Sequence, residues 1–470
     1  MLPVAALTLL APLLAAQGPA RWSVVETAKD NGHRLSPVPL PASPKHPAHA
    51  LPTISIDPGQ TFQEIVGFGG ALTESSAWVL AQLPPGKRAE VIRRYFDPTE
   101  GIGYTLARTH INSCDFSLNM WELDPVPGDY DLRQFSLAPM RAWLLPLIRD
   151  AQAAAGRDRF RLLASPWSPP AWMKTNGRMD GGGSLRPEYA PAWAEHYVRF
   201  CRAMESEEGV PVAALTVQNE PEVGQSWESC LYSPDEERAF VRDHLGPALA
   251  RAGLSGVKLL GWDHNRDRLE ARARALLGDP QCARFLWGLA IHWYVSRDFQ
   301  ASARVHEAFP EKQILFTEGA VEGAQMIGLW ENGERYAHQI IGDLSNWVVG
   351  FLDWNIVLDQ RGGPNHVGNF CDAPVIVDTR SGEVRYGPSF YSIAHFSSYV
   401  RPGARRIASR GEPGTPESIA FHNPDGSLVV VVLNTAGEPA EFAIAVGSET
   451  LPCHIPARAI QTYVAAPPRR

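Results

Sequence analysis

The sequence predicts an α/β protein: a (β/α)8 barrel, the TIM-barrel fold, with an attached antiparallel β-sandwich domain. Three observations lead to this fold class. Eight short apolar runs alternate with longer amphipathic segments, closely spaced strands follow after residue 400, and one isolated strand-like segment precedes the barrel. Strands that are buried on both faces have continuous apolar runs, and eight of them separated by helices are typical of this barrel.

The N-terminal region predicts a signal peptide followed by a single strand. Residues 1–16 form a short apolar run that ends in small residues, so secretion or export to the periplasm is the expected localisation. The segment WSVVET, which begins at Trp22, predicts a strand, and the proline-rich stretch from Pro37 to Pro52 predicts an extended linker. We expect residues 21–57 to contribute this strand to the β-sandwich.

The barrel is expected between residues 58 and 400. Its predicted strands are the apolar runs at 65–71, 104–111, 160–167, 213–220, 257–264, 285–294, 312–319 and 348–358. Amphipathic segments such as 141–156, 191–206 and 235–253 predict helices between them. An open doubly wound sheet is the alternative, but GFGGAL at 67–72 does not complete the GxGxxG phosphate loop that such a sheet needs early in the chain.

Residues 401–468 predict a small antiparallel β domain. Its expected strands, at 407–411, 418–423, 427–434, 440–446 and 460–465, are separated by turn signals such as Asn-Pro-Asp-Gly at 423–426. A unit of about 65 residues is small for an independent sandwich. The N-terminal strand is therefore expected to complete it.

Composition narrows the classes of function. The chain has 470 residues, a formal net charge of −8, 44% hydrophobic residues and 20% charged residues, so it can bury a large core. Its Lys and Arg form no basic stripe, which argues against nucleic-acid or anionic-membrane binding, and no later apolar run is long enough for an integral membrane segment. Six cysteines are scattered without CxxC pairs, so their pairing stays open.

Polar and aromatic residues cluster at the carboxyl ends of the predicted strands, where barrel enzymes have their active sites. Any one of them alone would be interpreted as a loop carboxylate or a core aromatic, but several strand ends agree. They are Arg108, His110, Asn112, Asp115, Trp167, Asn219, Glu220, His292, Trp293, Tyr294, Glu318, Asp353, Trp354 and Asn355.

Two of these residues, Glu220 and Glu318, end the fourth and seventh predicted strands and can face each other across the barrel mouth. Glycoside hydrolysis needs such a pair, because one carboxyl protonates the leaving oxygen while the other attacks or activates water. A partly desolvated pocket would raise the pKa of one carboxyl so that it keeps its proton. The aromatic residues Trp167, Trp293, Tyr294 and Trp354 could supply flat apolar surfaces for a sugar ring.

Other mechanisms are disfavoured. The sequence has no GxSxG elbow, no HExxH motif and no Walker A motif. His292 could be a metal ligand, but no second His or Asp lies at ligand spacing, so we expect it to form a hydrogen bond near Glu318 or to pack. We predict no metal and no cofactor.

Several motifs resemble those of glycoside hydrolase family 30, in particular its glucosylceramidases. They are GFGGALTESSA, RTHINSCDFS, LLASPWSPPAWMKTNG, TVQNEP, GLAIHWY, LFTEGA, VVGFLDWN and GGPNHVGNFCDAPVIVD, which occur in this order, and the match continues to PDGSLVVVVLN.

The resemblance implies a retaining β-glycosidase that forms a covalent glycosyl-enzyme and acts on a β-glucoside, either a glycolipid or an oligosaccharide. It implies that Glu220 is the acid/base and Glu318 the nucleophile. The family's sugar-binding residues fall on Asp115, Trp167, Asn219, Trp354 and Asn369, its aromatics beside the nucleophile on Trp293 and Tyr294, and its supporting arginine on Arg108.

Departures from the mammalian glucosylceramidases leave the aglycone open. The nucleophile motif is Thr-Glu-Gly rather than Ser-Glu-Ala, Gln218 replaces a Glu, and RTHINSCDFS also resembles microbial members that cleave β-1,6-glucan. A β-1,6-glucanase or a β-xylosidase is therefore the alternative within the same chemistry. A non-catalytic carbohydrate-binding barrel is the alternative of another class, and the two intact glutamate motifs argue against it.

The loops after the last three predicted strands are expected to meet the aglycone. They contain the apolar residues Met326, Ile327, Leu329 and Trp330. If these residues form an exposed lip, a lipid aglycone is expected; the alternative is that they pack at the start of a helix.

Overall fold

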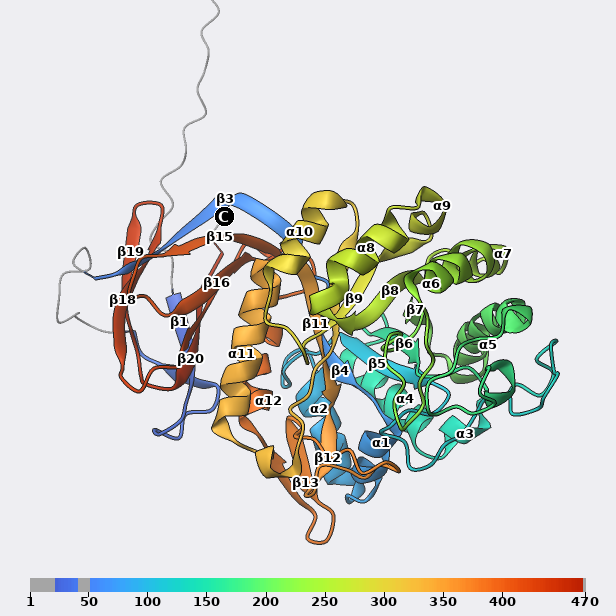
Figure 1. The fold of residues 1–470 in the computed structure, drawn as a ribbon. Helices are drawn as coiled ribbons and strands as arrows, with labels where there is room; N and C mark the ends of the chain where they lie inside the picture. The colour runs from blue at the N-terminus through green and yellow to red at the C-terminus, as the bar shows by residue number, and fades with distance from the viewer. Residues whose placement is uncertain (1–21, 41–50, 468–470) are drawn as a thin grey trace, which may run out of the picture.

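The structure, a computed structural model, describes residues 22–40 and 51–467. It has two parts, a barrel surrounded by helices and a β domain beside it (Figure 1). The expected signal peptide at 1–16 lies outside the described residues. Within the described ranges, no helix has the length and apolar character needed to cross a membrane.

Eight parallel strands close into a barrel in the order β10-β11-β4-β5-β6-β7-β8-β9, which confirms the predicted fold class. The strands are β4 (Gly67–Ala71), β5 (Leu106–Ile111), β6 (Arg161–Pro166), β7 (Val212–Thr216), β8 (Lys258–Asn265), β9 (Leu286–His292), β10 (Gln313–Glu318) and β11 (Val348–Asn355). Each lies within or overlaps one of the predicted apolar runs. Apolar side chains from several strands, such as Leu106, Leu260 and Leu315, form a buried cluster inside the barrel.

Helices cover the outside of the barrel. The α-helices are α1 (Glu74–Ala81), α2 (Pro85–Phe96), α3 (Ala138–Arg141), α4 (Leu144–Ala155), α5 (Ala190–Glu208), α6 (Pro234–Phe240), α7 (Gly246–Arg251), α8 (Leu269–Leu277), α9 (Pro280–Ala283), α10 (Gln300–Ala308), α11 (Trp330–Ser345) and α12 (Pro388–Ser397). The single helix predicted at 235–253 is interrupted by a π-helical turn at Val241–Leu245. A small sheet of β12 (Val357–Asp359), β13 (Val375–Asp378) and β14 (Glu383–Tyr386) follows β11.

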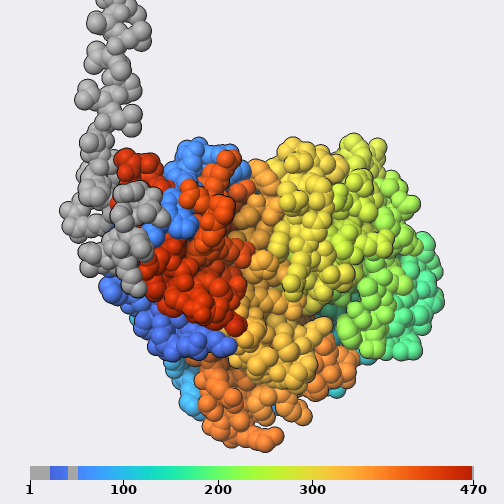
Figure 2. Space-filling view, turned by 60° about the vertical axis from the view of Figure 1, so that its left-hand side comes forward, coloured from blue at the N-terminus to red at the C-terminus, as the bar shows by residue number. Residues whose placement is uncertain are grey.

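The β domain is built from both ends of the described chain. Its nine strands follow the order β19-β18-β3-β15-β16-β17-β20-β1-β2. They are β1 (Trp22–Ala28), β2 (Ser36–Val38), β3 (Thr53–Glu64), β15 (Arg405–Gly411), β16 (Glu417–His422), β17 (Leu428–Asn434), β18 (Ala440–Val446), β19 (Glu449–Ile455) and β20 (Ala459–Ala465). Strand β1 pairs with β20, and Figure 2 shows the blue N-terminal segments against the red C-terminal strands.

Two details of the β domain differ from the sequence prediction. The predicted boundary at residue 58 falls inside β3, which pairs with β15 and β18, so the first barrel strand begins only at Gly67. Strand β19 was not predicted because Pro452 lies within it. Proline is tolerated there because β19 is an edge strand, where a missing backbone donor breaks no ladder.

The barrel and the β domain meet along α11 and α12. His395 of α12 is fully buried between Thr462 of β20 and Thr27 of β1, with its ring nitrogens 2.8 and 3.0 Å from their hydroxyl oxygens. At the edge of the same junction Arg458 forms an ion pair with Glu334 of α11 at 2.5 Å. This junction therefore joins the two parts through polar contacts as well as apolar packing.

All six cysteines lie in the described residues and are buried free thiols. The pairing that the sequence left open is resolved: none of them forms a disulfide in this structure.

Candidate active site

A pocket of about 240 Å³ opens at the carboxyl ends of the barrel strands. Most of the residues predicted for the site line it: Asp115, Trp167, Asn219, Glu220, Tyr294, Glu318, Trp354 and Asn369. They come from seven different segments of sequence and are brought together because parallel strands all end at the same face of the barrel.

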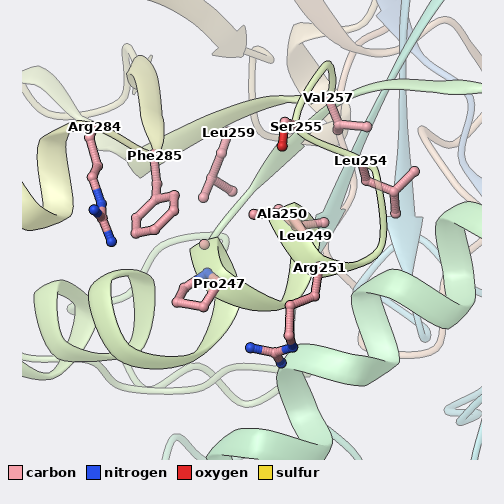
Figure 3. A pocket seen from close by; sticks show the side chains of 11 residues that line it. Pro247, Leu249, Ala250, Arg251, Leu254, Ser255, Val257, Leu259, Arg284 and Phe285 are labelled. Atoms are coloured by element: carbon pink, nitrogen blue, oxygen red, sulfur yellow. The ribbon is translucent and has the colours of Figure 1, made fainter.

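A larger hollow of about 580 Å³ lies at the opposite end, near the starts of β8 and β9 (Figure 3). Its walls are mainly apolar, with Pro247 and Leu249 of α7 facing Phe285, and two arginines, Arg251 and Arg284, at its rim. No carboxylate lines it. Size therefore does not identify the reactive site, whereas the chemistry of the lining does.

Glu318 is the last residue of β10, and its carboxylate accepts two hydrogen bonds. Arg108 of β5 donates from Nη1 to Oε2 at 2.5 Å, and the Tyr294 hydroxyl donates to Oε1 at 2.9 Å. Both Glu318 and Arg108 are buried. The two donors fix the orientation of the carboxylate and stabilise its ionised form.

Glu220 lies four residues beyond the end of β7, on a backbone that the neighbouring strands hold in place. Its N–H donates to the Asp263 carbonyl at 3.0 Å, and the N–H of Asn219 donates to Pro166 at 2.8 Å. Glu220 has a φ of 49°, in the left-handed region that a side chain seldom adopts. Such backbone outliers persist where the surroundings determine them, and they concentrate at functional sites.

The Glu220 carboxylate faces three polar side chains. His292 Nδ1 lies 3.3 Å from Oε1, His264 Nδ1 lies 3.6 Å from the same oxygen, and Gln225 Nε2 donates to Oε2 at 3.4 Å. The same His292 nitrogen is 3.9 Å from Oε1 of Glu318. One imidazole nitrogen thus lies close to an oxygen of each carboxylate.

Asp263 of β8 contacts both Arg108 and His292 and so connects the groups around the two glutamates. It accepts hydrogen bonds from Arg108 at 2.8 Å, from the hydroxyls of Thr216 and Thr317 at 2.6 Å each, and it lies 3.1 Å from His292 Nε2. The Asp263 side chain is fully buried. Its charge is balanced by Arg108 and by the imidazole, which leaves His292 oriented with Nδ1 toward Glu220.

The network shifts several pKa values. Burial by itself would raise the pKa of Asp263, but Arg108 and His292 lower it well below its usual range. Burial opposes a charge on His292, yet the carboxylates around it, Glu318 first, raise its pKa to about 9. Burial raises the pKa of Glu318 in spite of His292 and Arg108. For Glu220, burial is outweighed by His292, and its pKa is lowered.

The remaining wall of the pocket combines two stacked aromatic rings with a polar pair, Asn369 and Asp115. Trp167 and Trp354 stack on each other with centroids 5.2 Å apart, and the Arg108 guanidinium lies 4.9 Å from the Trp167 ring centroid. Asn369 donates to Asp115 Oδ2 at 3.2 Å, while Asp115 Oδ1 is buried without a hydrogen-bond partner. The pKa of Asp115 is raised well above its usual range, mainly because the carboxyl is buried. An unpartnered buried oxygen at a pocket wall is available to a ligand hydroxyl.

The structure corrects two expectations about aromatic and apolar contacts. Trp293 does not line the pocket: its indole donates to the Ala320 carbonyl at 3.1 Å and packs against Phe316 and Tyr336. The expected lip residues Met326, Ile327, Leu329 and Trp330 also lie outside the lining. The exposed apolar residues of the lining are Val223 and Val295, with 37% and 68% of their surface accessible.

The prediction that His292 has no second ligand nearby was also incomplete. The ligand atoms of Glu220, His264 and His292 all lie within 4.8 Å of one another, close enough to hold a cation. Sequence spacing did not show this because the three residues end three different strands. The two nitrogens of His292 already face Glu220 and Asp263, which suits a proton-carrying imidazole. The expectation that no metal is used remains a prediction.

Asp263, His264 and Gln225 were not among the predicted site residues. A signal for Asp263 and His264 was present, because they end the fifth predicted strand, at the same face as the others. Gln225 lies in the loop after Glu220, and nothing in its spacing indicates that the loop folds back over the glutamate.

Comparison with known proteins agrees with this geometry. Residues 65–400 match the glycosyl hydrolase family 30 TIM-barrel domain, and residues 403–463 match the glycosyl hydrolase family 30 beta sandwich domain. Lysosomal acid glucosylceramidase of Mus musculus is 37% identical over 411 residues, which cover 83% of this chain and 79% of the relative.

Two further relatives span nearly the whole chain. An endo-1,6-beta-D-glucanase of Neurospora crassa is 29% identical over 459 residues, 93% of each protein. The crystal structure of SrfJ from Salmonella typhimurium superposes with a TM-score of 0.89 at 34% identity, over 95% of this chain and 100% of that one. The paired glutamates at the barrel mouth, the attached β domain and these matches lead to one conclusion: the chain belongs to glycosyl hydrolase family 30 and is a glycoside hydrolase.

Proposed function

We propose that the protein is a retaining β-glucosidase in which Glu318 is the nucleophile and Glu220 the acid/base. The observation that carries the proposal is the convergence of both carboxylates on His292 Nδ1, at 3.3 Å from Glu220 and 3.9 Å from Glu318. Retaining enzymes need their two carboxyl groups close together, about 5–5.5 Å apart, because one of them attacks the sugar directly.

In the first step, a Glu318 oxygen attacks the anomeric carbon while the bond to the aglycone oxygen breaks and Glu220 delivers a proton to that oxygen. Water then attacks the same carbon, gives its proton to Glu220 and releases Glu318. The donors Arg108 and Tyr294 support the role of Glu318 as nucleophile, since both stabilise its ionised form.

The proton for the leaving group is shared between Glu220 and His292. The ring donates through Nε2 to Asp263, so Nδ1 either carries the proton toward Glu220 Oε1 or accepts one from the Glu220 carboxyl across 3.3 Å. Because the pKa of His292 is raised to about 9, the pair keeps this proton through neutral pH. Glu220 can then act as an acid although its own pKa is lowered.

A mechanism-based inactivator tests the assignment. A 2-deoxy-2-fluoroglucoside with a good leaving group should form a stable ester on Glu318, identified by mass spectrometry of the labelled peptide. Glu322 lines the same pocket, so Glu322→Gln should still be labelled at Glu318 and serves as the control. A label on any other carboxylate, or an α-anomer as the first product by NMR, would contradict the proposal.

For the aglycone, we propose a lipid of the glucosylceramide kind. Val223 follows Glu220 by three residues, so part of the exposed apolar surface of the rim lies near the acid, where the leaving group departs. Val295, which follows Tyr294, is the most accessible apolar side chain of the same rim. The relative named a glucosylceramidase supports this substrate, and the relative named an endo-1,6-beta-D-glucanase supports β-1,6-glucan as the second candidate.

Matched substrates separate the two candidates. Glucosylceramide in detergent should be hydrolysed with a kcat/KM at least equal to that of a β-1,6-linked glucose dimer, and Val295→Ser should lower only the first value. Val126→Ser is the control, since Val126 is 42% accessible but does not line the pocket. A strong preference for the dimer, unchanged by Val295→Ser, would favour the glucanase and leave the two-glutamate chemistry intact.

A further inference from the structure

The segment between β12 and β13 forms one wall of the sugar pocket and carries Asn369 into it. Its turn is ordered from within: Asn365 Oδ1 accepts hydrogen bonds from the N–H groups of Gly368 at 2.7 Å and Asn369 at 3.1 Å, and the Asn365 amide donates to the Asn369 carbonyl at 2.6 Å. Residues 365–369 are therefore a preformed unit, whose placement over the pocket depends on contacts with other loops.

His366 makes two of those contacts. Its backbone N–H and its ring Nδ1 lie 3.2 and 3.0 Å from the Ser117 carbonyl oxygen, in the loop after β5. Its Nε2 lies 3.3 Å from Oε2 of Glu228, in the loop after β7. His366 thus links residues 365–369, which include Asn369, to two loops of the barrel mouth.

Both ring nitrogens of His366 face oxygens that can only accept a hydrogen bond. The Ser117 carbonyl requires a proton on Nδ1. Nε2 and Glu228 Oε2 lie at ion-pair distance, and neither atom has a hydrogen-bond partner, so a proton on Nε2 would balance the buried negative charge and the arrangement suits an imidazolium. Glu228 is fully buried, and its other oxygen accepts a hydrogen bond from the Ser113 hydroxyl. In the described part of the chain, no other Lys, Arg or His lies within ion-pairing distance of Glu228.

We propose that His366 and Glu228 form an ionic latch that positions residues 365–369, so that Asn369 meets Asp115 in the sugar pocket. His366 is a positioning residue in this proposal, because it acts through Asn369 and does not line the pocket. The proposal rests on the proposed function only in that the sugar ring is taken to occupy this pocket.

The charged groups around the latch support a proton on His366. Burial by itself would lower the pKa of His366, but Glu228, the Ser117 carbonyl and Asp115 together raise it above its ordinary value of 6.5. Lys174 interacts electrostatically with Glu228, but its ammonium donates to the carbonyls of Met179 at 2.9 Å and Ser229 at 2.5 Å, so its hydrogen bonds are directed elsewhere. His110, also close to Glu228, is buried and has its pKa lowered, which leaves it neutral.

This proton makes the latch sensitive to pH. A histidine whose pKa is raised by folding contributes stability that is fully present below 6.5 and is lost as the pH rises through its raised pKa. When Nε2 loses its proton, its lone pair faces the buried carboxylate of Glu228. Residues 365–369 then lose their ion pair with the loop after β7. The sugar site should then loosen as the pH rises through the raised pKa of His366.

His366→Gln tests the latch by separating KM from kcat. At pH 6 the KM for an aryl β-glucoside should rise roughly three- to tenfold, with kcat changed less than about twofold. In the wild type, KM should increase with pH above 6.5, whereas in His366→Gln it should not vary with pH. The control is His338→Gln, because His338 forms an ion pair with Glu417 at 2.9 Å far from the pocket, and its KM–pH curve should match the wild type.

Hydrogen exchange gives a readout that needs no glycosidase activity. After correction for intrinsic rates, amides of the peptide spanning 359–371 should exchange faster at pH 8.5 than at pH 6 in the wild type, and equally fast at both values in His366→Gln. If they do so while no glucoside is cleaved, the latch stands and the proposed function fails. A KM–pH curve or an exchange pattern that is the same in His366→Gln and the wild type would overturn the latch.

Discussion

Two histidines of this protein are equally buried, but at neutral pH one ring is protonated and the other is neutral. His292, at the barrel mouth, and His395, at the junction with the β domain, both have no accessible surface. The pKa of His292 is raised to about 9, and burial lowers that of His395 to about 3. Burial opposes the charge in both, so the difference comes from their neighbours.

His292 faces three carboxylates, whereas His395 faces only hydroxyls. The Thr462 hydroxyl donates to the His395 carbonyl and so accepts from Nδ1, which gives a neutral ring complete hydrogen bonding. The barrel mouth thus concentrates buried charge that can move protons, while the junction uses a polar side chain to join two layers without charge. The comparison teaches that the function of a buried polar residue follows from the charges it meets rather than from its depth.

The largest expected effect comes from removing the proposed acid of the active site, Glu220. Glu220→Ala should lower kcat by about 10²–10⁴ for substrates with poor leaving groups and far less for activated aryl glucosides, which depart without a proton. Added azide should restore part of the turnover and give a β-glycosyl azide. Glu322→Ala removes another carboxylate of the same pocket and should show no such dependence on leaving group. Equal losses for both substrate classes would rule out Glu220 as the acid.

Removing the carboxylate that charges His292 should have the next largest effect. Asp263→Asn should lower kcat by roughly 10²–10³ and move the alkaline limb of the kcat–pH profile to lower pH, because the pKa of His292 falls when a neighbouring negative charge is lost. Asp343→Asn is matched to it: Asp343 is also buried and bonded twice to an arginine, Arg266, at 2.8 Å, but away from the pocket. It should reduce stability without shifting the alkaline limb.

A smaller effect is expected at Asp115, a buried carboxyl of the mouth that forms no ion pair in the described part of the chain. Because its free oxygen is positioned to meet a sugar hydroxyl, Asp115→Ala should narrow the preference for a glucoside over the corresponding xyloside by about 1–3 kcal/mol in transition-state binding. Ratios of kcat/KM for the two aryl glycosides measure this. Asp124→Ala, which removes a buried carboxyl outside the pocket, should leave the ratio unchanged.

The smallest effect on turnover is expected at the other histidine. The folded state binds fewer protons at His395 than the unfolded chain does, so this residue destabilises the fold as the pH falls from 6.5 toward 3. His395→Gln should make the free energy of unfolding less dependent on pH in that range and leave kcat/KM unchanged. An equally steep dependence in His395→Gln would show that the ring is not neutral.

The barrel could be predicted from the sequence because each strand is a continuous apolar run, and the glutamate pair because Glu220 and Glu318 follow such runs. Trp293 could not be placed, since a tryptophan at a strand end is equally suited to the pocket wall and to the core behind it. Asp263 was overlooked although its position followed the same rule. Val223 and Val295 depend on loop conformation, which periodicity does not encode.

The pairing of β1 with β20 has a consequence for how the protein is made. Trp22 lies opposite Ala465 in the ladder, and β3 likewise takes partners from beyond residue 400. At about 5–20 residues per second, a ribosome needs roughly 20–90 seconds to synthesise the chain between these partners. During that time the barrel can close, while β1 has only β2 as a partner and β3 has none of its neighbours in the sheet. The β domain is therefore the last part to fold, and the apolar faces of its first strands must be kept from other chains until the final strand emerges.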